Sequence, residues 1–371
     1  MRLFDPADPA APWPAVSPAE RAFIAALAAD TRAQVANVAT RVRALATDAG
    51  QVLPVTIDDG ARGDSYVATP TAAYVDYARR EIELVGVPGG AALRGLVGVA
   101  GAVLRAARID RIVNVDNWLL STNLHGGWTG ADLPAIRRLL ANAFPDHLIA
   151  IRSVDAWSSP ALVAAARADG WVMMPSRQVW VVDDLARDWR PRNQFGNDRR
   201  LLARSGLAVD VARSDDSGRI AELYHQLYVG KYSALNPVFT PRFVAGTMES
   251  GLIRYRVARG ADGRAVAVAG LLARGGVATP PVVGYDRSVP VAAGLYRIAC
   301  FLFMQEAMAR GWRLHGSAGA AHFKRLRGAR GVIEYWAMSV DHLSAPRRAA
   351  IRGFAALLER AIVPMMRRYG W

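Results

Sequence analysis

Only two of the 46 basic residues are lysines, and these positions, Lys231 and Lys324, are the first candidates for chemistry. An ammonium is a compact point charge that fits beside a developing oxyanion and loses its proton when desolvated, whereas a guanidinium does neither readily. Lys324 is therefore predicted to be catalytic, as the donor that stabilises an oxyanion. In the alternative interpretation, it is one member of a solvated basic cluster with Arg325, Arg327 and Arg330.

The basic cluster that follows Lys324 is also a candidate site for phosphate groups. Helical spacing places Lys324 and Arg327 on one face, with Arg325 beside them. Guanidinium groups bind phosphate oxygens through paired hydrogen bonds. We therefore predict that Arg325, Arg327 and Arg330 bind the phosphates of a donor substrate.

Ser317 ends the strand predicted just before Lys324, and its hydroxyl is a further candidate. We predict that it donates to a substrate oxygen or relays a proton to a leaving group. His315 faces the same way because side chains alternate along a strand. A serine and a histidine at this spacing, without a third group to orient them, are weak support for a nucleophilic triad.

Strands and helices alternate along the first half of the chain, as in an α/β layered fold. Before them we expect a Pro-rich leader and a long Ala-rich helix from Ser17 to about Ala49. The charged, Pro-containing stretch 183–198 is the best domain boundary. The predicted units are therefore a leader with its helix over 1–50, one domain over 51–185 and another over 186–371. Strands are predicted at 51–57, 65–68, 111–118, 147–154 and 171–182, and helices at 72–85, 131–144 and 160–169.

From residue 208 onward, the predicted order of elements is β-α-β-β-β-α-β-α-β-α. Its three central strands, over 252–259, 265–273 and 277–285, form a meander whose first turn is a good hairpin signal. The sequence thus predicts mixed central sheets flanked by helices in both halves. The later elements are a helix over 292–310, a strand over 312–317, a short helix over 320–327, a strand over 332–340 and a helix over 345–368.

Composition limits the classes of protein that this chain can belong to. With 371 residues, 52% of them hydrophobic, two domains are the default. The single cysteine, Cys300, excludes a disulfide framework, and without clustered histidines no metal site is expected. A reducing, cytoplasmic location follows. We expect no signal peptide, because prolines interrupt the N-terminal stretch, and no membrane span, because no apolar run reaches roughly 18 residues.

The net charge of +14 is unevenly distributed. Residues 1–190 carry 19 basic and 20 acidic residues, whereas residues 191–371 carry 27 and 12, a net charge of +15. A genomic preference for arginine explains the choice of Arg over Lys, but it does not explain the asymmetry. A basic half beside a neutral one favours a polyanionic partner such as a nucleic acid, a phosphate-bearing cofactor or an acidic membrane surface.

The order of elements and the segment 282–331 resemble the GNAT acyltransferase superfamily, and more closely its Fem-like branch. The resemblance covers about half of the chain. The run of elements over 111–182 resembles a second, degenerate copy, as in the tandem GNAT-like domains of Fem-type transferases. The residues that carry the resemblance are Gly294-Leu295-Tyr296, Ala307, Gly311, Ser317-Ala318-Gly319, Phe323-Lys324 and Arg327-Gly328.

The resemblance implies acyl transfer from a carrier to an amine, without metal or covalent intermediate. In the wider superfamily a turn at a helix N-terminus holds the pyrophosphate of coenzyme A, which the free N–H groups and the helix dipole favour. The stretch 287–294 does not match that turn. Fem-type enzymes have a similarly eroded turn and use aminoacyl-tRNA, which suits a basic domain. Gly294 and Tyr296 are expected to contact the donor, and Lys324 matches the Fem-type lysine that stabilises the oxyanion.

The resemblance also implies positions for the acceptor. The segment before the meander lines the acceptor pocket in this superfamily, so Lys231, Tyr232 and Asn236 are expected to bind substrate, together with Tyr285. Asp286 follows the strand where GNAT enzymes splay their sheet, and is expected to orient or deprotonate the attacking amine. The alternatives are a structured surface loop around Lys231 and a helix cap at Asp286.

The sequence therefore predicts an N-acyltransferase that moves an aminoacyl or acyl group from aminoacyl-tRNA to an amine of a small molecule or peptide. One alternative is an acyl-coenzyme A-dependent GNAT N-acetyltransferase. Another is a non-catalytic RNA-binding protein on a GNAT scaffold, because fold alone does not grant activity. No tightly bound cofactor is expected. The acyl group, the acceptor and the oligomeric state are not indicated.

Overall fold

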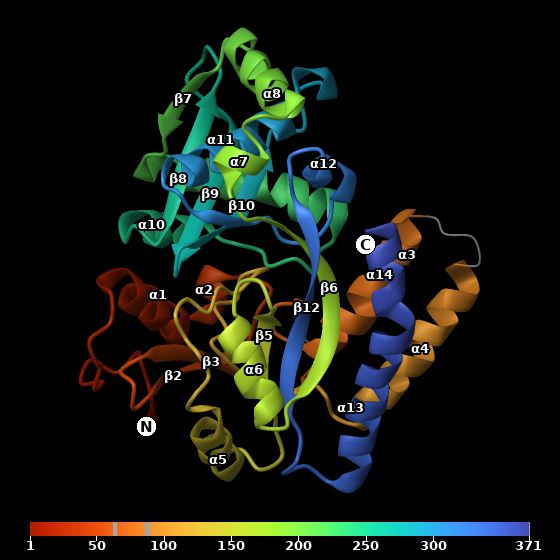
Figure 1. The fold of residues 1–371 in the computed structure, drawn as a ribbon. Coiled ribbons are helices and arrows are strands. Elements are labelled where there is room, and N and C mark those ends of the chain that lie inside the picture. Colours follow the sequence, from red (N-terminus) through yellow and green to blue (C-terminus); the bar gives the residue numbers. More distant parts are fainter. Residues whose placement is uncertain (62–64, 86–89, 371) are drawn as a thin grey trace.

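The computed structural model describes residues 1–61, 65–85 and 90–370, and one sheet of twelve strands runs through it (Figure 1). The central strands are largely buried because helices cover both faces of the sheet; in β5 every residue is buried. The strands are β1 Arg2–Phe4, β2 Arg41–Ala46, β3 Val52–Asp59, β4 Arg111–Val115, β5 Leu148–Val154, β6 Val172–Val182, β7 Ala208–Val211, β8 Ile253–Arg259, β9 Ala265–Arg274, β10 Val277–Tyr285, β11 Arg313–His315 and β12 Arg330–Ser339.

The helices occupy most of the chain between the strands. Three short segments are π-helical, Ala72–Asp76, His225–Tyr232 and Leu358–Ile362, and two are 3₁₀ turns, Ser214–Asp216 and Val291–Ala293. The α-helices are α1 Pro18–Ala29, α2 Thr31–Gln34, α3 Tyr77–Val85, α4 Gly90–Ala106, α5 Leu133–Ala143, α6 Pro160–Ala168, α7 Leu185–Asp188, α8 Asn193–Arg204, α9 Ser217–Tyr224, α10 Pro241–Glu249, α11 Leu295–Ala309, α12 Ala321–Arg325, α13 Ala345–Leu357 and α14 Val363–Tyr369.

The sheet has the same topology when it is followed from either edge. Its order is β1-β2-β3-β4-β5-β12-β6-β11-β10-β9-β8-β7. In each half an antiparallel meander of four strands ends in one parallel pair, β4 with β5 and β10 with β11. The two halves thus repeat one arrangement of elements.

The halves exchange their last strands. β6 belongs to the first half by sequence, yet it lies between β12 and β11. β12 closes the second half by sequence, yet it lies between β5 and β6. Each half therefore lacks a central strand unless the other half supplies it.

The N-terminal region differs from the predicted leader and long helix. The helix that begins after Ser17 ends at Ala29, where Asp30 caps the next short helix, α2. Residues 41–46 form β2 instead, because their alternation of polar and apolar side chains fits a half-buried strand. The segment predicted as a strand at 65–68 is a turn. The alanine-rich composition predicted a helix up to about Ala49, but tertiary packing overrides helix propensity after Ala29.

A shared hydrophobic core joins the N-terminal helix to the second half. Phe23 of α1 stacks on Trp118 with ring centroids 5.7 Å apart and meets Phe243 of α10 edge to face at 5.9 Å. The same cluster includes Tyr224 of α9 and Tyr255 of β8. The first 50 residues are therefore part of the folded body rather than a separate leader.

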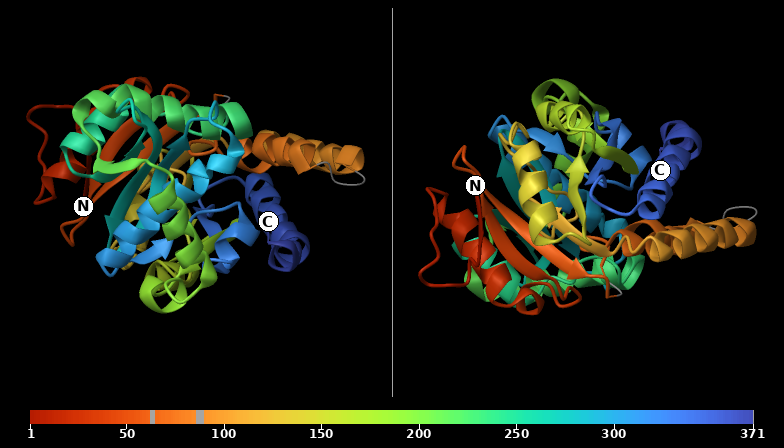
Figure 2. Two further views of the ribbon diagram at one scale, coloured as in Figure 1. Left: turned by 90° about the horizontal axis from the view of Figure 1, so that it is seen from above. Right: turned by 90° about the horizontal axis from the view of Figure 1, so that it is seen from below.

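Helices cover both faces of the first half of the sheet. α5 and α6 pack over β4 and β5, whereas α4 and α13 lie together over the other face. The α3–α4 pair forms a hairpin that projects from the body beside α13 and α14 (Figure 2). The glycine-rich stretch that forms α4 gave no clear signal in the sequence.

One helical stretch of the described chain, Val291–Ala309, is long and apolar enough to cross a membrane by length and composition alone. Half of this stretch is buried in the fold. Its helical part, α11, packs against β9 and β10 in the core. The apolar composition of α11 therefore has an explanation within the folded protein.

The strand exchange predicts that the halves do not fold separately. Fragments 1–190 and 191–371 expressed alone should be insoluble or lack a cooperative melting transition, because each exposes unpaired strand edges in the middle of its sheet. Expressed together, they should form a soluble one-to-one complex, which size-exclusion chromatography and thermal unfolding would detect. A fragment that melts cooperatively on its own would contradict this prediction.

Candidate active site

Strands β10 and β11 are parallel neighbours that separate soon after they begin. They pair only where residues 277–278 lie opposite residues 313–314. The next part of β10 contains Pro280 and Pro281, which lack the N–H group that a ladder requires, and the register toward β9 shifts at this point. The end of β10 and the loop after β11 are thus not joined by ladder hydrogen bonds.

Lys324 lies on α12, directly after that loop. Its Nζ donates to the carbonyl oxygens of Ala318, at 2.7 Å, and Ser317, at 3.2 Å. Ser317 and Ala320 both have left-handed φ angles, 59° and 50°, which are costly for residues other than glycine. The strained loop turns the carbonyls of Ser317 and Ala318 toward the Lys324 ammonium. The third N–H of this ammonium remains for another acceptor.

Burial lowers the pKa of Lys324 to about 7, although Cys300 nearby opposes the shift. A group with this pKa exchanges its proton near neutral pH, which an arginine at the same place would not do. The two carbonyl acceptors favour the charged form. The Lys324 amine is thus poised between an ammonium donor and a neutral base.

Ser317 belongs to a chain of hydrogen bonds that crosses from one half of the protein to the other. Thr122 Oγ1 donates to Ser317 Oγ at 3.1 Å and accepts from Arg177 Nη2 at 3.0 Å. Arg177, on β6, binds both oxygens of Glu334, on β12, at 2.8 and 3.2 Å. Because Thr122 donates to it, the Ser317 hydroxyl keeps its own proton for a substrate.

The Arg177–Glu334 pair is held in the centre of the sheet. The Glu334 side chain is 2% exposed and that of Arg177 is 20% exposed. Burial lowers the pKa of Arg177, but the Glu334 carboxylate outweighs this and shifts the pKa upward. Glu334 therefore serves as the partner of Arg177, because both of its carboxylate oxygens accept from that guanidinium.

Two other reactive side chains near Ser317 and Lys324 are in inert forms. Burial lowers the pKa of His315, whose Nδ1 accepts from the backbone N–H of Ser317 at 3.2 Å rather than from its hydroxyl. Burial raises the pKa of the Cys300 thiol to about 12. Neither a Ser–His nucleophile nor a cysteine thiolate is present in this arrangement.

Asp286 does not have the environment that a general base needs. One of its carboxylate oxygens accepts from the N–H and the hydroxyl of Ser288, at 2.9 and 2.6 Å, and the other pairs with Arg219 of α9. The Ser288 hydroxyl, with Arg219, lowers the pKa of Asp286. The predicted catalytic role at Asp286 is thus replaced by a structural one, because both oxygens are engaged and the carboxylate is a weak base.

Two of the three arginines predicted to bind donor phosphates are engaged elsewhere. The Arg327 side chain, 4% exposed, donates to Asp198 Oδ2 from Nε at 2.9 Å and from Nη2 at 2.6 Å. Arg330 pairs with Asp183 at 3.1 Å. Arg327 is a buried structural residue because a guanidinium in the protein interior requires a counter-charge.

Arg325 remains available for a donor. Its guanidinium lies 5.3 Å from the ring centroid of Trp180 and, among the described residues, has no carboxylate partner. At the start of α11, Gly294 has a left-handed φ of 67°, and no side chain caps the helix. Tyr296 lies between Phe323 and Tyr285, with ring centroids 5.1 and 6.1 Å apart. These aromatic rings adjoin Lys324 through Phe323.

The residues predicted to bind the acceptor separate into two kinds. Lys231 and Tyr232 lie exposed at the end of the π-helical turn, with Lys231 Nζ 5.2 Å from the Tyr232 ring. Asn236 is 3% exposed, and its amide donates to the carbonyls of Tyr228 and Ser233. Asn236 therefore fixes the loop, whereas Lys231 and Tyr232 are accessible to a substrate. Tyr285 is half-buried beside Tyr296.

A basic surface beside α12 was not anticipated from the sequence. A hollow of about 360 Å³ at the start of α8 is lined by Arg190, Arg192 and Arg200. Arg199 is exposed on the same helix, and Arg192 donates to the carbonyl of Arg325 at 3.4 Å. Within the described parts of the chain, none of these arginines pairs with a carboxylate. We call this set the α8 basic surface, comprising Arg190, Arg192, Arg199, Arg200 and Arg325.

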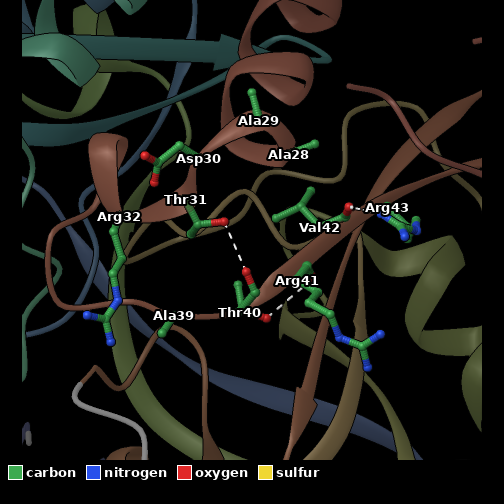
Figure 3. Close-up of a pocket in the computed structure, with 10 residues that line it drawn as sticks. All are labelled: Ala28, Ala29, Asp30, Thr31, Arg32, Ala39, Thr40, Arg41, Val42 and Arg43. Atoms are coloured by element: carbon green, nitrogen blue, oxygen red, sulfur yellow. Dashed lines mark hydrogen bonds between the residues drawn. The ribbon is translucent and has the colours of Figure 1, made fainter. Parts of the chain in front are cut away.

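A second hollow lies far from Lys324, between α1–α2 and β2 (Figure 3). It has a volume of about 330 Å³, and Thr31 spans it by donating to the carbonyl of Thr40 at 3.0 Å. The arginines at its rim, Arg41 and Arg43, are paired with Asp59 and Asp5. β2 lies six strands from β11 in the sheet, so this hollow is not part of the Lys324 site.

Comparisons with known proteins agree with this geometry. Residues 190–325 match the family model of the acetyltransferase (GNAT) domain. The crystal structure of FemX superposes with a TM-score of 0.52 at 8% identity, covering 85% of this chain and 90% of that one. No functionally curated protein has a significantly similar sequence.

Weaker structural similarities were also found. L-PGS from Bacillus licheniformis has a TM-score of 0.44 at 13% identity, covering 60% of this chain and 78% of that one. A GCN5-related N-acetyltransferase from Kribbella flavida has a TM-score of 0.34 at 16% identity, covering 62% and 83%.

The protein is therefore an acyltransferase with a GNAT domain in its second half. Its fold over most of the chain is the Fem-like arrangement, with mixed α/β layers as predicted. The GNAT match contains Lys324, Arg325, Gly294 and Tyr296, and it also spans the α8 basic surface.

Arg327 and Arg325 should respond differently to replacement by alanine. Arg327→Ala leaves the buried Asp198 without one of its partners and should destabilise the fold by about 3–5 kcal/mol. Arg325→Ala should leave thermal stability nearly unchanged, because the side chain is exposed. It should weaken donor binding, because one guanidinium of the α8 basic surface is lost. Urea unfolding and donor titration of both variants would test this. Equal stability of the two variants would contradict the structural role of Arg327.

Proposed function

We propose that this protein transfers an aminoacyl or acyl group from an activated ester to an amine by direct attack. The amine nitrogen forms a bond to the carbonyl carbon, the bond to the donor oxygen breaks, and the amine loses a proton while the leaving oxygen gains one. The observation that carries this proposal is the position of Lys324. Its ammonium, anchored by two carbonyls, has one N–H left for the oxyanion of the tetrahedral intermediate.

The proton that the leaving oxygen needs has a candidate source in Ser317, whose hydroxyl is restored by the proton that the amine loses. The Ser317 hydroxyl accepts a hydrogen bond from Thr122 and is free to donate its own proton. The backbone carbonyl of the same residue accepts from the Lys324 ammonium, so the hydroxyl and the ammonium lie close together. Arg177 and Glu334 are positioning residues, because they orient Thr122 and do not themselves lie at the reacting atoms. Asp286 is left out of this mechanism.

The donor that fits the surface best is aminoacyl-tRNA. The α8 basic surface offers several unpaired guanidiniums beside α12, which suits a phosphodiester chain better than one small cofactor. Acyl-coenzyme A is the alternative, supported by the uncapped start of α11 at Gly294. We infer no tightly bound cofactor in either case, and the acceptor is an amine of a small molecule or a peptide near Lys231 and Tyr232.

Replacing Lys324 should lower the rate without abolishing donor binding. Lys324→Met should reduce kcat by about 10²–10³, the usual cost of removing one oxyanion donor. Lys324→Arg should also lose rate, because a planar guanidinium does not fit the position between the Ser317 and Ala318 carbonyls. Wild-type kcat/KM should fall as pH rises through the pKa of Lys324, about 7, as the ammonium is lost.

Single-turnover kinetics of these variants over a pH series would give the measurement. The falling limb of the profile should be absent in Lys324→Met. If Lys324→Arg kept full turnover, Lys324 would be a phosphate-binding residue instead. A wild-type rate that rises through pH 7 and stays flat in the Met variant would identify the amine as a base.

The donor can be identified by salt dependence. Charged tRNA should bind with an affinity that falls steeply with salt, and Arg199→Ala with Arg200→Ala should lower the slope of log K against log salt by about 2. The matched control, Arg41→Ala with Arg43→Ala, removes the same charge from β2 and should leave the slope unchanged. Turnover with acyl-coenzyme A but not with charged tRNA would support the alternative donor.

A further inference from the structure

The outer face of α4 carries large apolar side chains in solvent. Leu96, Val99 and Val103 are 68%, 66% and 46% exposed, and they are three and four residues apart. This spacing puts all three on one face of the helix. A single exposed leucine or valine is ordinary, but a continuous stripe on one helix face marks an interaction surface.

Another face of α4 already provides the contacts that the fold requires. Leu104 is fully buried and Val97 packs into the same cluster, which includes Ile351 and Ala355 of α13. The outer stripe therefore does not contribute to the core. Its apolar character needs a partner outside the folded body, from which the hairpin projects (Figure 2).

The net charge of the helices on this flank indicates the chemistry of that partner. Residues 90–106 contain Arg94 and Arg105 and no acidic residue. The neighbouring C-terminal segment, residues 345–370, contains six arginines and one glutamate. Arg360, Arg367 and Arg368 in that segment are exposed. This flank therefore combines an apolar stripe with an excess of positive charge.

We propose that the α3–α4 hairpin docks on an anionic membrane surface through Leu96, Val99 and Val103. Helices with one apolar face and basic surroundings lie in the interface of anionic bilayers, where headgroups and arginines attract each other. A second copy of this chain is a poorer partner, because symmetric pairing would bring like-charged arginines together. Docking of this kind is peripheral and involves no span.

This proposal goes beyond the proposed function and does not depend on it, because binding can be measured without donor or acceptor. The full-length protein would be sedimented with vesicles of phosphatidylcholine alone and of an equal mixture of phosphatidylcholine and phosphatidylserine. The protein should partition onto the anionic vesicles, and less so at high salt. The variant Leu96→Ser/Val99→Ser/Val103→Ser should lower the partition coefficient by about tenfold or more.

The control is Val211→Ser with Val291→Ser, which removes two valines that are 58% and 95% exposed elsewhere and should leave vesicle binding unchanged. Thermal unfolding would confirm that the variants fold, and Leu96→Ser alone tests the most exposed position. The proposal is overturned if the wild type ignores anionic vesicles, or if the triple variant binds them equally well. It is also overturned if sedimentation velocity shows a dimer that the triple variant dissolves, because a second copy would then cover the stripe.

Discussion

The backbone ladder between β6 and β12 holds the protein together, and the Lys324 site depends on it. The ladder runs from Arg330 opposite Val181 to Met338 opposite Val172. It shifts register where Tyr335 meets Pro175, a residue that cannot donate to a ladder. Arg177 and Glu334 face each other directly beside this irregularity. The same ladder that exchanges the strands therefore places the ion pair that orients Thr122, and through it Ser317.

The charge asymmetry has a structural consequence that follows from burial. Among the twelve acidic residues of 191–371, four are buried with arginine partners: Asp198, Asp216, Asp286 and Glu334. A buried carboxylate must be paired, so these acids neutralise arginines that are internal. The surplus arginines are left at the surface. The excess of +15 in sequence thus becomes the exposed basic surfaces of α8 and of the C-terminal helices.

This partition shows what sequence reasoning could and could not predict. Local patterns predicted the meander, α11, α12 and the position of Lys324 after the end of a strand, because alternation and capping are short-range signals. They could not distinguish Arg325 from Arg327, because the distinction depends on Asp198, which is 129 residues away in sequence from Arg327. The link from Ser317 to Thr122 spans 195 residues and was equally invisible.

In the N-terminal segment, too, secondary structure depends on residues that are not local in sequence. An alanine-rich stretch favours helix by propensity, and residues 18–29 do form one. Residues 41–46 become a strand because β3 lies alongside and supplies the hydrogen bonds. The special role of Lys324, by contrast, could be predicted from residue type alone. A chain that uses arginine almost everywhere has a lysine at 324, where two carbonyl oxygens converge on one point and burial brings the pKa near 7. A guanidinium would spread its charge over a plane and keep its proton there, so the site requires a lysine for both its size and its titration.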